Sequence, residues 1–100
     1  MRLSRLITAR TYFRIQPKGK PLPLHSRDID GKPVDGIFVF KSTEEMADTV
    51  GLWRPSELTG TEVVEIEYSG VEKEHDLENG TLIDPAKARI TRRRSLKEYL

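Results

Sequence analysis

Residues 61–69, TEVVEIEYS, carry the clearest alternation of apolar and polar positions in the chain. Side chains of a strand project alternately to its two faces, so Val64, Ile66 and Tyr68 would share one face. Glu65 and Glu67 would project from the other face. The pattern predicts a β-strand with one face in the core.

A second β-prone segment covers residues 11–16, TYFRIQ, and a third covers residues 2–8, RLSRLIT. Aromatic and β-branched residues are enriched in strands, which favours this assignment for both segments. The two faces of the second segment would carry Tyr12, Arg14 and Gln16 on one side and Phe13 and Ile15 on the other.

The apolar run of residues 37–40, IFVF, predicts a short central strand that is covered on both faces. Ser42-x-x-Glu45 follows directly and is typical of a helix start, because the serine hydroxyl accepts the N–H three residues on. Apolar residues at helical spacing come next. They predict a principal helix over about 43–51 that covers one face of the strand.

The loop and the C-terminal part complete the predicted fold. Residues 17–36 contain four prolines and three glycines and predict one long loop. Residues 81–84 and 87–95 read as two more strands, the latter with Arg89, Thr91 and Arg93 on one face, and Ser95-x-x-Glu98 predicts a helical turn. The 100 residues therefore predict one α+β domain with a mixed, mainly antiparallel sheet of four to six strands.

Charge is divided unevenly along the chain, although the net charge is only +1. Residues 1–27 carry seven basic residues and no acid, residues 28–84 carry fifteen acids and four bases, and residues 85–100 carry six bases and one acid. One interpretation is that the basic ends pair with the acidic middle as neighbouring strands. The alternative is a basic face for nucleic acid or another acidic partner.

Candidate chemistry is sparse. The chain has no cysteine and no apolar run of membrane-spanning length, so we expect a cytoplasmic protein without disulfides and without contact to a membrane. His25 and His75 have no spaced partner ligand, so no metal site is predicted. Glu65 and Glu67 are paired carboxylates that could divide acid and base roles, or simply face arginines of the last strand.

In order along the chain, LSRLI, GIFVFKSTEEMADTV, EVVEIEY and IDPAKARITRRRSLKEYL together resemble small bacterial ADP-ribosyltransferase-like domains. The same outline also fits a bacterial or phage-borne family of unknown activity. The resemblance implies NAD as cofactor. It implies that Arg5 helps to hold NAD, that Ser42 or Thr43 lies at the middle element, and that Glu65 or Glu67 orients the ribose.

The absence of a convincing catalytic set in the sequence favours a non-enzymatic module that needs no cofactor and binds a protein partner through the loop 17–36 and the basic end segments. The NAD-dependent transferase, or a relic of one, is an alternative, and nucleic-acid binding through the basic ends is another. The sequence does not specify an oligomeric state. The residues that we expect to take part in binding are Arg10, Tyr12, Arg14, His25, Arg92, Arg93 and Arg94.

Overall fold

Three long strands form the larger of two sheets in the computed structural model, which describes residues 9–28, 30–74 and 80–99. They are β1 (Arg10–Pro17), β3 (Thr61–Tyr68) and β6 (Ala88–Arg94). The strand order is β1-β3-β6 and both pairings are antiparallel. These three strands confirm the predictions for the corresponding segments, whereas the strand predicted over residues 2–8 lies outside the described residues.

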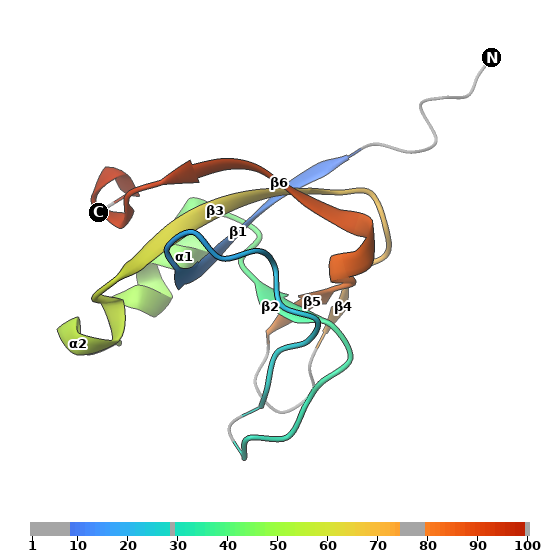
Figure 1. Cartoon of the computed structure of the whole chain (residues 1–100), viewed down its shortest axis with the longest axis horizontal. Coiled ribbons are helices and arrows are strands. Elements are labelled where there is room, and N and C mark those ends of the chain that lie inside the picture. Colours follow the sequence, from blue (N-terminus) through green and yellow to red (C-terminus); the bar gives the residue numbers. More distant parts are fainter. Residues whose placement is uncertain (1–8, 29, 75–79, 100) are drawn as a thin grey trace.

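A smaller antiparallel sheet lies beneath the long strands in Figure 1. Its strands are β2 (Ile37–Val39), β5 (Thr81–Ile83) and β4 (Lys73–Glu74), in the order β2-β5-β4. The prediction of a central strand at residues 37–40 is therefore wrong, because β2 is an edge strand of the smaller sheet. One face of β2 is buried, because Ile37 and Val39 lie where the two sheets meet, whereas Phe38 on the other face is only half-buried.

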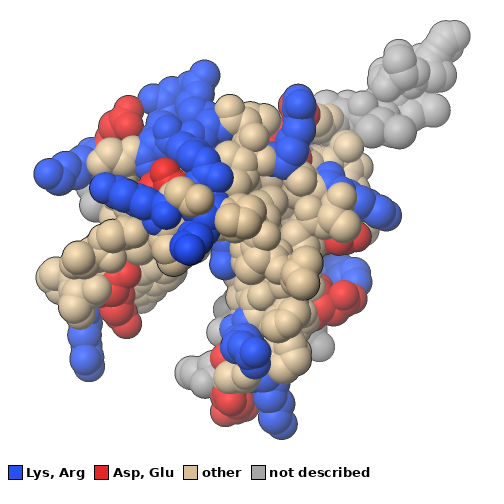
Figure 2. Space-filling view, viewed as in Figure 1, with Lys and Arg blue, Asp and Glu red and all other residues tan. Residues whose placement is uncertain are grey.

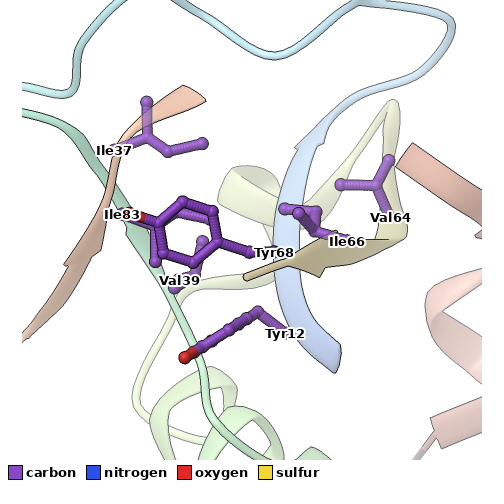
Figure 3. Packing of buried hydrophobic residues seen from close by; sticks show 7 residues of the cluster. All are labelled: Tyr12, Ile37, Val39, Val64, Ile66, Tyr68 and Ile83. Atoms are coloured by element: carbon purple, nitrogen blue, oxygen red, sulfur yellow. The ribbon is translucent and has the colours of Figure 1, made fainter. Parts of the chain in front are cut away.

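One hydrophobic cluster joins the two sheets (Figure 3). Tyr12 of β1 and Tyr68 of β3 meet edge to face, with ring centroids 5.9 Å apart. The cluster confirms the buried face predicted for β3. Its buried members are Tyr12, Ile37, Val39, Val64, Ile66, Tyr68 and Ile83.

The principal helix, α1 (Thr43–Val50), packs on the other face of the large sheet. Met46 and Val50 are buried against Val63, and Phe13 and Ile15 pack on the same cluster. The predicted helix is confirmed, but it covers the β1–β3 surface rather than β2 alone. A short helix that we did not predict, α2 (Pro55–Leu58), follows it.

The C-terminal part contains two single-turn 3-10 helices, η2 (Pro85–Lys87) and η3 (Leu96–Tyr99). The second confirms the predicted helical turn, and the Ser95 N–H donates to Glu98 Oε2 at 3.1 Å. A bulge shifts the β3–β6 register between Glu65 and Ile66. For this reason Arg89 and Arg93 do not share a face as predicted.

The α+β class, the single principal helix and the strand number are confirmed. The strands form two sheets, and every pairing among the described strands is antiparallel. Within the described ranges, no helix has the length and apolar character needed to cross a membrane.

Candidate functional site

A pocket of about 350 Å³ opens where β1 and β2 diverge beside α1. Phe13 and Phe40 form a single bridge, with one N–H···O contact of 2.9 Å and a reciprocal contact of 2.7 Å. Beyond this bridge the two strands no longer pair, and the pocket fills the space between them. Its lining residues are Arg14, Ile15, Phe38, Val39, Phe40, Glu45, Thr49, Trp53 and Gly80.

Arg14 bridges the two strands at this gap. Its Nη1 donates to the Phe38 carbonyl at 2.8 Å and to Ser26 Oγ at 3.4 Å, and its Nε donates to Gln16 Oε1 at 3.2 Å. Ser26 Oγ also accepts the Phe38 N–H at 2.9 Å. The backbone groups of Phe38 at the edge of β2 are therefore bonded by side chains, whereas in a continuous sheet they would bond to the backbone of the neighbouring strand.

The Arg14 guanidinium has only neutral acceptors among the residues that the structure describes. None of those residues places a carboxylate within ion-pair distance of it, and its Nη2 has no protein partner there. Burial lowers the pKa of Arg14 from its usual value, because desolvation disfavours the charged form. Arginine nevertheless stays protonated at neutral pH, so the pocket holds a cation that has no counter-ion among the described residues.

Aromatic side chains and α1 form the walls of the pocket. Phe38 and Phe40 come from the β2 segment, and Trp53 follows the end of α1. Gly80 lies so close to the Phe38 ring that a Cβ there would stand 2.6 Å from Cδ1. Glu45 of α1 also borders the pocket, with its Oε2 accepting the Lys41 N–H at 3.1 Å.

The helix start positions this wall. Ser42 Oγ accepts the Glu45 N–H at 3.1 Å, as the sequence predicts. The glutamate reaches back to the N–H of Lys41 rather than to that of Ser42. This cap places the first turn of α1 against the divergent strands, and Thr49 follows one turn later on the same side.

The basic C-terminal segment pairs with the acidic middle of the chain. Arg93 Nη1 lies 2.5 Å from Glu62 Oε2, and Arg94 Nε lies 3.1 Å from Glu65 Oε2. Figure 2 shows Lys and Arg side chains gathered where β6 runs, with acidic side chains among them. Cross-strand pairing with the acidic middle is thereby confirmed for the basic C-terminal segment.

Two basic residues named from the sequence are less firmly paired. Arg10 Nη1 lies 3.9 Å from Glu72 Oε2, and Arg10 is exposed. Arg92 is exposed and has no ion pair within the described ranges. Arg93 contacts Glu62 whereas Arg94 contacts Glu65, so the arginine run is split over two faces of β6.

Other binding candidates have structural contacts. Tyr12 is buried, and its hydroxyl donates to Glu72 Oε2 at 2.5 Å. Burial, reinforced by this carboxylate, raises the pKa of Tyr12. His25 is exposed in the loop, with Nδ1 3.3 Å from the Ser26 carbonyl. The described residues include no group of three or more metal-ligating side chains, and His75 lies outside them.

The described residues implied by the transferase resemblance do not line this pocket. Ser42 caps α1 and Thr43 begins it. Glu65 Oε2 accepts from Arg94 and from the Tyr99 hydroxyl, and burial with this carboxylate raises the pKa of Tyr99 to about 12. Glu67 pairs with Arg89 at 2.9 Å. Arg5 lies outside the described residues.

Sequence reasoning named Arg14 but not the residues that surround it. The signal that was present is the concentration of three of the seven aromatic residues between Phe38 and Trp53. Alternation and helical spacing assign such residues to a core. They do not show that two strands separate there.

Comparison of the chain with protein-family models, with curated proteins and with solved structures found no match.

Proposed function

We propose that this domain is a non-enzymatic binding module that receives a segment of a protein partner in the pocket between β1, β2 and α1. The observation that carries the proposal is the combination of three aromatic side chains with a cation that has only neutral described partners. Ligand sites are mostly apolar concavities with a few polar groups that orient the ligand. Aromatic residues and arginine are also enriched where protein partners bind.

The charge of the pocket favours a protein partner over a nucleic acid. Among the described residues that line it, Arg14 is the one basic residue, and Glu45 borders the same space. A polyanion would gain one contact and meet one carboxylate, whereas nucleic-acid sites neutralise several phosphates. The arginines of β6 that pair with Glu62 and Glu65 support the same preference.

A peptide selection tests the proposal directly. A library of random 12-residue peptides is selected on the immobilised full chain, and binding is then measured by fluorescence. Trp53 is the only tryptophan and lines the pocket, so its emission reports occupancy. NAD and single-stranded RNA are titrated in parallel.

Two variants of α1 provide the matched comparison. Thr49→Gln places a longer side chain in the pocket, and Asp48→Gln introduces the same side chain at the neighbouring exposed position. We expect selected peptides to lose affinity for Thr49→Gln and to retain it for Asp48→Gln. Peptides that bind both variants equally, a library that yields no binder, or saturable binding of NAD or RNA in the pocket would each overturn the proposal.

A further inference from the structure

The backbone of β1 presents a pair of polar groups to the pocket at Ile15. In an antiparallel strand the N–H and C=O of one residue point to one side, and those of the next residue point to the opposite side. Phe13 exchanges both of its backbone bonds with Phe40, so its polar groups point away from β3. Ile15 lies two residues further along β1, and its N–H and C=O point the same way.

At Ile15 the neighbouring strand has already diverged. Phe38, which would stand opposite Ile15 in a continuous ladder, gives its N–H to Ser26 Oγ and accepts from Arg14. No described residue bonds to the outward N–H or C=O of Ile15. Ile15 is half-buried and lines the pocket, and buried backbone groups are almost always paired.

Arg14 supplies the second feature. Its side chain lies on the face of β1 shared with Tyr12 and Gln16, whereas the side chain of Ile15 lies on the α1 face with Phe40 and Trp53. The Nη2 group of Arg14 carries two N–H donors without a described partner. A carboxylate is the acceptor that matches a guanidinium best.

We infer that the pocket binds an extended peptide segment by strand addition to β1 at Ile15, with an acidic side chain on Arg14 and an adjacent apolar side chain on the α1 face. The inference rests on the proposed function and specifies its ligand. Neighbouring residues of a strand project to opposite faces, so the acidic residue and the apolar residue must be consecutive. Glu45 lies on the α1 side and disfavours a carboxylate there.

Main-chain bonds from an added strand supply affinity, and side-chain pockets supply specificity. The pocket volume of about 350 Å³ suits a short stretch of chain and not a folded domain. A free edge at β6 is a weaker alternative, because its bulge and its arginines are features that protect an edge from pairing.

A pair of matched peptides tests the inference. The probes are the amidated and acetylated tetrapeptides GEFG and GQFG, which differ only in one carboxylate. Binding to the full chain is followed by Trp53 emission and by amide spectra of ¹⁵N-labelled protein. We expect GEFG to bind at least about tenfold more tightly than GQFG, the ratio typical of a charged hydrogen bond.

The difference between the peptides should disappear in Arg14→Gln and shrink in Arg14→Lys, which keeps the charge but loses the planar fork. The Ile15 amide should shift and exchange more slowly with solvent when GEFG is bound. The comparison of the two peptides on the unaltered chain stands even if an Arg14 variant fails to fold.

The outcomes separate this inference from the proposed function. If library-selected peptides bind in a manner sensitive to Thr49→Gln while GEFG and GQFG bind equally, the carboxylate assignment is wrong and the binding module stands. If GEFG binds without a change at Ile15, strand addition is wrong. If inorganic phosphate alone reproduces the response of GEFG, the site binds small anions and the peptide assignment falls.

Discussion

Replacement of Gly80 by alanine should lower the stability of the domain and disturb the pocket together. The added Cβ would stand 2.6 Å from Phe38 Cδ1 and 2.7 Å from Cε1, whereas ordinary contact begins at 3.4 Å. The Phe38 ring must therefore retreat by about 0.8 Å, and overpacking of this kind costs about 1–3 kcal/mol. The substitution also lowers the conformational entropy of the unfolded chain, which offsets about 0.4–1 kcal/mol of this loss in the free energy of unfolding.

Phe38 is only half-buried, so its ring can yield toward solvent and the cost lies at the lower end. We expect a net loss of about 0.5 kcal/mol in the free energy of unfolding, which lowers the urea midpoint by about 0.2–0.5 M. Urea unfolding followed by Trp53 emission measures it. The displaced ring should also weaken peptide binding to the pocket.

Gly51→Ala is the matched control at the end of α1. Gly51 has right-handed backbone with φ −59°, and a Cβ there would meet its nearest atom at an ordinary 3.5 Å. This variant should be as stable as the unaltered chain or slightly more stable. A Gly80→Ala midpoint equal to or above that of Gly51→Ala would refute the packing between Gly80 and Phe38.

Three further predictions concern the elements that support the site. Met46→Ala removes a fully buried side chain from the α1 interface. It should lower the free energy of unfolding by about 2–5 kcal/mol, measured by thermal or urea unfolding. A loss below about 1 kcal/mol would contradict the burial. Ser42→Ala removes the helix cap and should cost about 1 kcal/mol by the same assay, whereas unchanged stability would show that the hydroxyl contact at 3.1 Å is not formed in solution. Glu62→Gln should destabilise by about 1–3 kcal/mol, because Glu62 Oε2 accepts from the Gly19 N–H at 2.8 Å and from Arg93. The Gly19 backbone bond, then Arg93, lower the pKa of the Glu62 carboxyl, so its stabilisation is present above the ordinary carboxyl pKa and is lost as the pH falls through the lowered value. Urea midpoints measured from neutral to acidic pH should therefore converge for Glu62→Gln and the unaltered chain, with exposed Glu44→Gln as control, and parallel curves would contradict the assignment.

Local pattern predicted the elements that depend on near neighbours. Alternation at 61–69 predicted β3 and its buried face, since side-chain direction in a strand follows directly from residue spacing. Ser42 and Glu45 predicted the start of α1, because a cap needs only residues within one turn. The opposed charges of the chain ends and middle predicted the ion pairs across β3 and β6.

Which sheet each strand joined was decided by long-range packing. The sequence of β2 looks the same whether it lies at the centre of one sheet or at the junction of two, because burial and not position determines its apolar character. The bulge opposite Glu65 moved Arg93 to the other face of β6, and no local signal marked it. Both outcomes depend on residues far apart in the chain.

The amino-acid sequence alone determined the class of the fold, the main strands, the helix and its cap, since each follows from spacing over a few residues. Tertiary structure alone decided the pocket. It exists because β1 and β2 meet at Phe13 and Phe40 and then separate, which leaves Arg14 and the Ile15 backbone at a gap that α1 borders. Separation of two strands is set by how two sheets and a helix pack together, and no stretch of sequence encodes it by itself.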